Sequence, residues 1–128
     1  MLEGLMRVLL SIKPEFAELI LDGEKKFEFR KRIFKDKSVR KVIIYATKPV
    51  GRVIGEFDIG EILSSKPNEL WDTTKKHAGI SRDFFESYFL DKNIGFAIAV
   101  KNPKRYDEPM LLGDFLPGAI PPQSYRYV

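Results

Sequence analysis

Residues 23–30 (GEKKFEFR) carry the side chains that are best suited to chemistry in this sequence. Lys25 and Arg30 are cations that can contact a phosphate or another anion, and Glu28 is an acid that can orient a ligand or act as a base. A lysine beside a glutamate keeps its ammonium charge, which suits anion binding better than nucleophilic attack. The alternative is a structural salt bridge in which Glu28 holds the two cations in register.

The basic residues of the chain are concentrated between residues 24 and 41. This segment holds nine Lys or Arg and three Asp or Glu, whereas the whole chain of 128 residues has a formal net charge of only +4. A basic stripe on an otherwise nearly neutral protein is typical of a polyanion binder. The alternative is a solvated hairpin whose lysines keep a sheet edge soluble.

Five further residues are candidates for a binding cleft beside residues 23–30. Lys13 lies at a predicted strand–helix junction that should open on it. Tyr45 could stack on a base, and the alternative is a core tyrosine with a solvated hydroxyl group. Arg52 follows a predicted turn. Ser124 and Arg126 would reach the cleft if the C-terminal tail returns to it, and the alternative is a packed tail.

The composition excludes several classes of site. With no cysteine and one histidine, the chain cannot form a disulfide framework, a zinc ribbon, a thiol nucleophile or a multi-histidine metal site. Neither G-x-G-x-x-G nor a Walker loop is present. We therefore expect no cofactor and no metal. No signal peptide is recognised, and the longest apolar run is far shorter than the roughly 20 residues that span a bilayer, so we expect a cytoplasmic protein.

The elements that must position these residues follow from periodicity. Apolar runs and alternation predict strands over 7–12, 25–32, 39–47, 52–63 and 94–100, and helical spacing predicts helices over 14–22, 67–76 and 82–90. Gly23 should end the first helix, and Ser81 should cap the last. Gly55 and Gly60 are expected bends of a curved sheet. Pro103 should interrupt the last strand, and the tail from residue 106 should pack over the sheet.

Four residues match G-x-K-x-x-E-x-R, the signature of the ASCH domain family, a relative of the PUA fold: Gly23, Lys25, Glu28 and Arg30. Residues 44–49 (IYATKP) and 53–57 (VIGEF) also resemble that family. The resemblance covers nearly the whole chain. It implies an α+β fold, a PUA-like small mixed β-barrel of about six strands with two or three short helices, as a single domain over residues 1–128. It also implies a cleft beside the motif.

The resemblance further implies a nucleic-acid-associated role, including transcription or translation regulation. Some small bacterial members are amidohydrolases acting on N4-acetylcytidine, and another is similar to a ribonuclease in activity. In those amidohydrolases the motif lysine works with a threonine three residues later and with a more distant glutamate. Here Glu28 occupies the threonine position, and residues 77–80 (HAGI) contain no acid where the glutamate would fall. This departure argues against amidohydrolase chemistry of that kind.

These observations favour a binding module for RNA or a modified nucleoside, because unstacked bases can enter a cleft. The expected site comprises Lys13, Lys25, Glu28, Arg30, Tyr45, Arg52, Ser124 and Arg126. Two alternatives stay open: a small hydrolase, acting on N4-acetylcytidine or on RNA, and a regulatory module that binds a small molecule or a protein. We expect a monomer with no membrane attachment.

Overall fold

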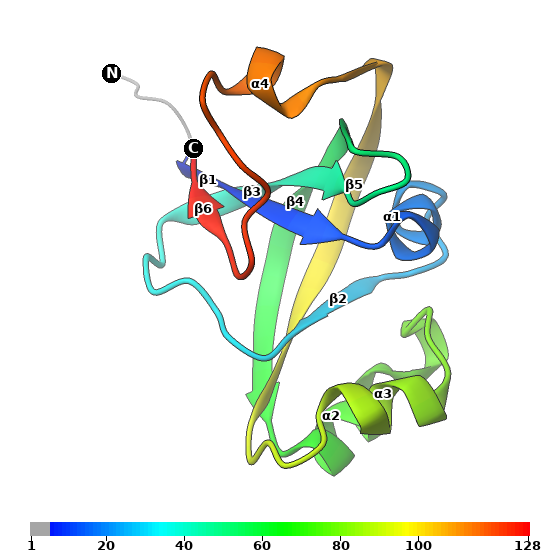
Figure 1. The fold of residues 1–128 in the computed structure, drawn as a ribbon. Coiled ribbons are helices and arrows are strands. Elements are labelled where there is room, and N and C mark those ends of the chain that lie inside the picture. The colour runs from blue at the N-terminus through cyan, green and yellow to red at the C-terminus, as the bar shows by residue number, and fades with distance from the viewer. Residues whose placement is uncertain (1–5) are drawn as a thin grey trace.

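The computed structural model describes residues 6–128, which form one six-stranded sheet with four short α-helices (Figure 1). In chain order, the elements are β1 (Met6–Ile12), α1 (Pro14–Leu21), β2 (Phe27–Arg30), β3 (Val39–Ala46), β4 (Arg52–Ser65), α2 (Pro67–Thr74), the 3-10 turn η1 (Lys75–His77), α3 (Arg82–Tyr88), β5 (Gly95–Met110), α4 (Leu112–Phe115) and β6 (Arg126–Tyr127). The expected α+β class with about six strands is confirmed, and α4 brings the number of helices to four.

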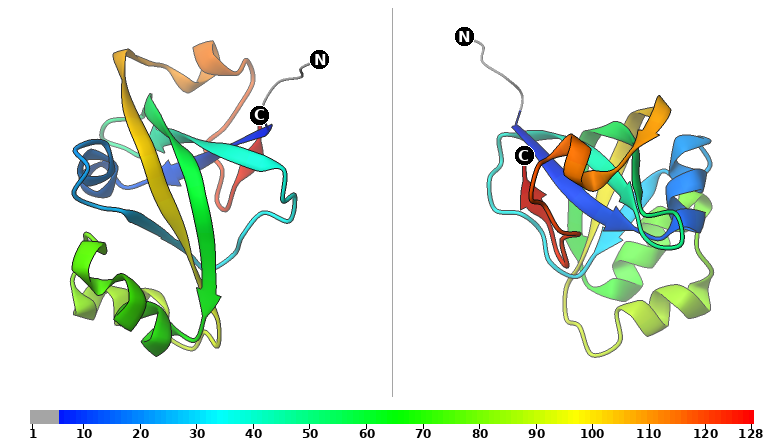
Figure 2. Two further views of the ribbon diagram at one scale, coloured as in Figure 1. Left: turned by 180° about the vertical axis from the view of Figure 1, so that it is seen from behind. Right: turned by 45° about the horizontal axis from the view of Figure 1, so that its top comes forward.

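The sheet is curled but open. Its strand order is β2-β5-β4-β3-β1-β6, and β1 and β3 are its parallel pair. The long strands β4 and β5 cross the molecule, with α4 toward one end and α2 and α3 together at the other (Figures 1 and 2). The sheet begins at β2 and ends at β6, so its two edges are not joined by a backbone ladder.

Three local signals place α1 and α3 where the sequence predicts them. Pro14 is the first residue of α1, where its fixed φ and missing N–H suit the first turn. Gly23 has a φ of +85° just beyond that helix, the conformation that turns the chain away. The Ser81 hydroxyl accepts a hydrogen bond from the Phe84 backbone N–H at 3.1 Å, so Ser81 caps α3.

The course of β5 corrects one expectation. The strand runs from Gly95 to Met110 and passes through Pro103, so the predicted interruption at this proline is wrong. The register with β4 shifts between Glu56 and Asp58, and the neighbouring Asn102 has a φ of +50°. Such a bulge leaves a backbone N–H outside the ladder, so a proline there sacrifices no hydrogen bond.

The predicted bends at Gly55 and Gly60 coincide with the other irregularities of β4. Its register with β5 shifts between Val53 and Gly55 and again across Gly60. A Cβ atom at Gly55 would lie 2.6 Å from the Lys104 carbonyl oxygen. Only glycine permits that approach of the two backbones, which lets the sheet curl here.

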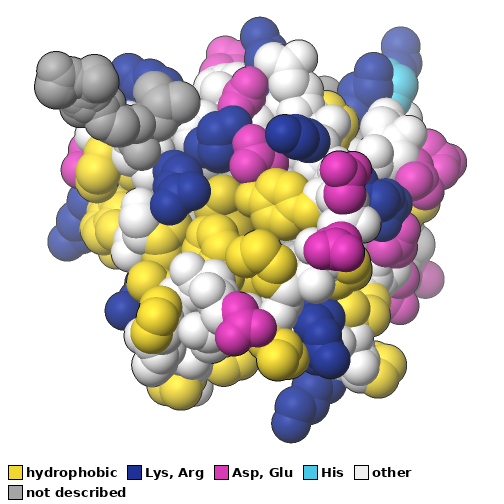
Figure 3. Space-filling model, turned by 90° about the horizontal axis from the view of Figure 1, so that it is seen from above, with side chains coloured by type: hydrophobic (Ala, Val, Ile, Leu, Met, Phe, Trp, Pro, Cys, Tyr) yellow, Lys and Arg dark blue, Asp and Glu magenta, His cyan; other side chains and the backbone are white. Residues whose placement is uncertain are grey.

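The core is divided into three clusters of buried side chains. The largest lies between α1 and the sheet, and the third lies beneath α4 around Leu9, Ile43 and Leu112. Hydrophobic side chains surrounded by charged ones also gather on the surface at the α4 end (Figure 3). The second cluster is aromatic and packs α2 and α3 against β2 and β5. Within residues 6–128, no helix is long and apolar enough to cross a membrane.

Candidate functional site

A pocket of about 300 Å³ lies where β1, α1, β2 and α3 meet. Four of the predicted site residues line it: Lys13, Lys25, Glu28 and Arg30. Four aromatic side chains also line it: Phe16, Phe29, Phe84 and Tyr88. The structure therefore combines cations, one carboxyl group and aromatic rings in a single hollow.

Lys25 lies in the turn before β2 and is almost completely buried, with an exposed fraction of 1%. Its Nζ donates a hydrogen bond to the Ala78 carbonyl oxygen at 2.5 Å. The same atom lies 4.8 Å from the centre of the Phe29 ring and 5.4 Å from that of Phe16. These contacts hold the ammonium group between aromatic faces, where cation–π attraction replaces part of its lost hydration.

Glu28 reaches the same pocket because β2 begins at Phe27, later than the sequence predicts. Strict alternation from Lys25 would have placed the two side chains on opposite faces of a strand. The turn that contains Lys25 removes this conflict. Glu28 has an exposed fraction of 6%, and its Oε2 atom lies 3.3 Å from an Arg30 nitrogen.

Burial shifts the two ionisable groups in opposite directions. It lowers the pKa of the Lys25 ammonium to about 8, and the nearby Glu28 carboxylate opposes this change. Burial raises the pKa of the Glu28 carboxyl above its ordinary value, opposed by Arg30 and Lys25. Lys25 thereby becomes a stronger acid and Glu28 a stronger base, a pairing that is common where protons are transferred.

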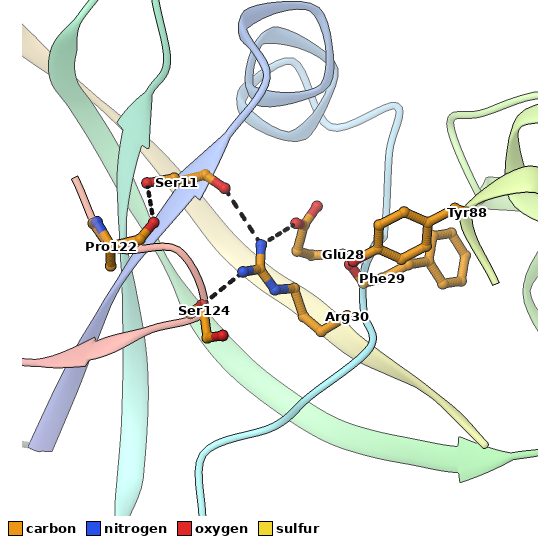
Figure 4. Close-up of polar contacts among 7 residues, drawn as sticks. All are labelled: Ser11, Glu28, Phe29, Arg30, Tyr88, Pro122 and Ser124. Atoms are coloured by element: carbon orange, nitrogen blue, oxygen red, sulfur yellow. Dashed lines mark hydrogen bonds and ion pairs between the residues drawn. The ribbon is translucent and has the colours of Figure 1, made fainter. Parts of the chain in front are cut away.

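Arg30 connects the two sides of the open sheet. Its guanidinium donates to the Ser11 carbonyl of β1 and to Glu28, each at 3.3 Å, and to the Ser124 carbonyl at 2.6 Å (Figure 4). The Ser11 hydroxyl donates to the Pro122 carbonyl at 2.8 Å. The side chain of a β2 residue thus bridges β1 and the segment that precedes β6, across a gap that no backbone ladder closes.

The aromatic walls are held in place by neighbours. Phe84 packs edge-to-face on Phe16, with ring centres 5.1 Å apart. The Tyr88 hydroxyl donates to the Phe29 carbonyl at 3.3 Å. The Lys13 ammonium lies 5.2 Å from the centre of the Phe84 ring, which brings a cation to the mouth of the pocket.

Four predicted residues do not line this pocket: Tyr45, Arg52, Ser124 and Arg126. Tyr45 points to the opposite side of β3, into the third core cluster, because alternation along the strand sends Ile44 toward α1 and Tyr45 toward α4. The Arg52 guanidinium is exposed and donates to its neighbour, the Gly51 carbonyl, at 3.0 Å. Arg126 is exposed on the edge strand β6. Ser124 lies next to the pocket, where its carbonyl oxygen accepts a hydrogen bond from the Arg30 guanidinium.

The predicted helix over residues 82–90 carries four aromatic residues, which helical spacing predicts on its buried side: Phe84, Phe85, Tyr88 and Phe89. The structure divides these four aromatic residues between two adjacent stripes of α3. Phe85 and Phe89 are buried in the aromatic cluster, whereas Phe84 and Tyr88 line the pocket. The signal was present in the spacing, since two i, i+4 aromatic pairs cover more of a helix than one core-facing stripe requires.

No group of three or more histidine or acidic side chains is placed to hold a metal ion in the part of the chain that the structure describes. The ionisable side chains that line the pocket include those of Lys13, Lys25, Glu28 and Arg30.

Comparisons with known proteins agree with the motif. The family model for the ASCH domain matches residues 10–108. An "ASCH domain-containing ribonuclease" from Zymomonas mobilis is 32% identical over 121 residues, which cover 93% of this chain and 82% of the relative. A large ribosomal subunit protein of Ureaplasma parvum is 28% identical over 84% of this chain but only 35% of its own length. The crystal structure of ASCH from Zymomonas mobilis superposes with a TM-score of 0.87 at 30% identity, covering 95% of this chain and 87% of that one. The expected PUA-like architecture is thereby confirmed, and the chain belongs to the ASCH domain family.

Proposed function

We propose that this protein binds single-stranded RNA by placing a base in the pocket between α1, β2 and α3. The observation that carries the proposal is the meeting of aromatic rings and cations in one hollow of about 300 Å³. Proteins that bind single strands stack bases on aromatic side chains and attract the backbone with basic ones. Half-buried Phe84 and Tyr88 offer the first kind of contact, and Lys13 and Arg30 offer the second.

Two further observations support a polyanionic nucleic acid as the ligand. The basic segment 24–41 begins at this pocket, and Lys31, the residue after β2, lies with its Nζ 4.7 Å from the centre of the Tyr88 ring. The Zymomonas mobilis relative carries the name of a ribonuclease, whose substrate class is RNA. RNA is favoured over duplex DNA because its unstacked bases can enter a pocket.

The proposal is tested by fluorescence anisotropy with a labelled 12-nucleotide RNA of mixed sequence at two salt concentrations. Phe84→Ala should weaken binding about tenfold or more, because stacking of one base on an aromatic ring contributes roughly 1–3 kcal/mol. Phe115→Ala is the matched control, because this half-buried ring packs in the third cluster and does not line the pocket. Equal affinity of the two variants, or no RNA binding by the wild type at low salt, would refute the proposal.

A second candidate function at the same pocket is RNA hydrolysis, favoured by the opposite pKa shifts of Lys25 and Glu28. The Glu28 carboxylate would accept the proton of a 2′-hydroxyl as its oxygen attacks phosphorus. The Lys25 ammonium would donate a proton to the departing 5′-oxygen. The products would be a 2′,3′-cyclic phosphate and a free 5′-hydroxyl, as expected for acid–base catalysis of this kind.

Hydrolysis is tested by product analysis with an RNA that carries a single 2′-deoxy nucleotide. The bond after that nucleotide should stay intact while the other bonds are cleaved, because its attacking hydroxyl is missing. Glu28→Gln should slow cleavage by about 10²-fold or more while RNA remains bound. Cleavage of an all-deoxy strand, or an unchanged rate in Glu28→Gln, would contradict this mechanism.

A further inference from the structure

A second hollow of about 260 Å³ adjoins the pocket on the side of β2 that leads into the basic segment. The two hollows share Arg30, Tyr88 and Gln123, so a ligand that fills one can extend into the other. Three further cations line the second hollow: Lys31, Arg32 and Lys92. No Asp or Glu of the described chain lines it.

These cations come from two separate parts of the chain. Lys31 and Arg32 follow directly after β2, whereas Lys92 lies between α3 and β5. Among residues 6–128, no carboxylate forms an ion pair with any of the three. Gathering like charges without a counter-charge is unfavourable in the free protein, and an anion bound between them would relieve that repulsion.

The first hollow is mainly aromatic and the second is cationic, which matches the base and the phosphate of a nucleotide. The first is walled by Phe16, Phe84 and Tyr88, which suit the flat face of a base. The second presents ammonium and guanidinium groups, which donate hydrogen bonds to phosphate oxygens. Arg30 and Gln123 stand at the junction, where the sugar of a bound nucleotide would lie.

We propose that the second hollow is a phosphodiester subsite, which binds the backbone phosphate next to the base held in the pocket. This inference rests on the proposed RNA binding and narrows the ligand to a strand of at least two nucleotides. A free modified nucleoside, which has no phosphate, would leave the three cations without an anionic partner. The basic segment therefore contributes to the site through Lys31 and Arg32, at its pocket end, more than through its lysines farther along.

The experiment compares two pairs of charge removals that change the net charge equally. One variant carries Lys31→Gln and Lys92→Gln, in the second hollow. The control carries Lys35→Gln and Lys37→Gln, which are exposed residues of the same basic segment that line neither hollow. Affinity for the 12-nucleotide RNA is measured across a salt series, and the melting temperature of each variant is recorded.

The subsite pair should weaken binding more than about tenfold and reduce the slope of log affinity against log salt by about 1, because each phosphate contact releases counterions. The control pair should change both quantities less than half as much. Equal losses in the two pairs would overturn the subsite and indicate general attraction to a basic surface. If the protein does not bind RNA at all, the wild type will show no binding at any salt concentration. That result would refute both the proposed function and the subsite.

Lys31→Gln also removes a cation that contacts the Tyr88 ring. A second measurement therefore tests the subsite in the wild-type protein, without any substitution. Amide chemical shifts of the wild-type protein are followed during addition of a dinucleoside monophosphate or of the corresponding nucleosides. The dinucleoside monophosphate should shift the amide signals of Arg32 and Lys92, and the nucleosides should shift only signals at the pocket. Identical shift patterns from the two ligands would overturn the subsite.

Discussion

Because Lys25 is buried, its charge should lower the free energy of unfolding by an amount that depends on pH. Folding lowers the pKa of its ammonium group from 10.5 to about 8. One pKa unit corresponds to about 1.4 kcal/mol, so the folded state disfavours this charge by about 3 kcal/mol relative to the unfolded chain at pH 7. Lys25→Met removes the charge and keeps most of the buried side-chain length. It also leaves the Ala78 carbonyl without its donor, which opposes the gain by about 1–3 kcal/mol.

Lys25→Met has two effects on stability, removal of a buried charge and loss of a hydrogen bond, and only the first depends on pH in this range. Between pH 8 and 10.5 the unfolded chain holds the Lys25 proton and the folded protein does not. The free energy of unfolding therefore rises as pH increases through this window. From pH 7 to pH 9.5, the wild type should gain about 2 kcal/mol from this residue alone, because the penalty falls from about 3 to about 1 kcal/mol. Lys25→Met should lack that gain.

Urea unfolding at pH 7 and pH 9.5, followed by the fluorescence of Trp71 beside the aromatic cluster, measures both values for each variant. Lys76→Met is the matched control, since Lys76 is exposed and its removal should change stability equally at the two pH values. A stability difference between Lys25→Met and wild type that is the same at both pH values would refute the lowered pKa of Lys25. That result would mean that Lys25 keeps an ordinary pKa in the folded protein.

Two other substitutions test how the pocket is built. Gly79→Ala should destabilise the fold by more than about 1 kcal/mol and weaken RNA binding, because Gly79 has a φ of +71° and its Cβ would lie 2.5 Å from the Lys25 side chain. Gly113→Ala, with no atom within 4 Å, is the control in urea unfolding, and equal stabilities would contradict this packing. Arg30→Lys keeps the charge but cannot reach three acceptors at once, so it should destabilise the protein by about 1–3 kcal/mol and speed hydrogen exchange in residues 124–128. Unchanged exchange there would show that Arg30 does not hold the C-terminal segment.

The part of the site that the sequence predicts best is the part that is local in the chain. Lys25, Glu28 and Arg30 lie within six residues of one another, and a turn followed by a short strand is enough to bring them to one pocket. Gly23 shows why: its positive φ ends α1 and sets the direction in which the chain enters that turn.

The parts that escaped prediction depend on packing between distant segments. Tyr45 could face either side of β3 until the positions of α1 and α4 are known, since a strand presents its residues alternately to both. Gln123 reaches the pocket because the C-terminal segment is tied to β1 and to Arg30, and its own sequence surroundings give no such signal. Pro103 suggested an end to the strand, whereas the bulge in β5 accommodates it.

The motif residues contribute to the fold and to the site in opposite ways. Arg30 stabilises the structure by joining the edges of an open sheet. Lys25 destabilises it, because its buried charge is one that an apolar residue of similar length would not carry. Sequences usually retain a destabilising buried charge only where it has a function. Lys25 and Glu28 are consequently motif residues whose presence stability alone does not explain, and both line the pocket that the aromatic walls complete. Glu28 and the rings of Phe16 and Phe29 compensate the Lys25 charge in part, and an anionic ligand, such as the RNA backbone of the proposed function, would compensate it further.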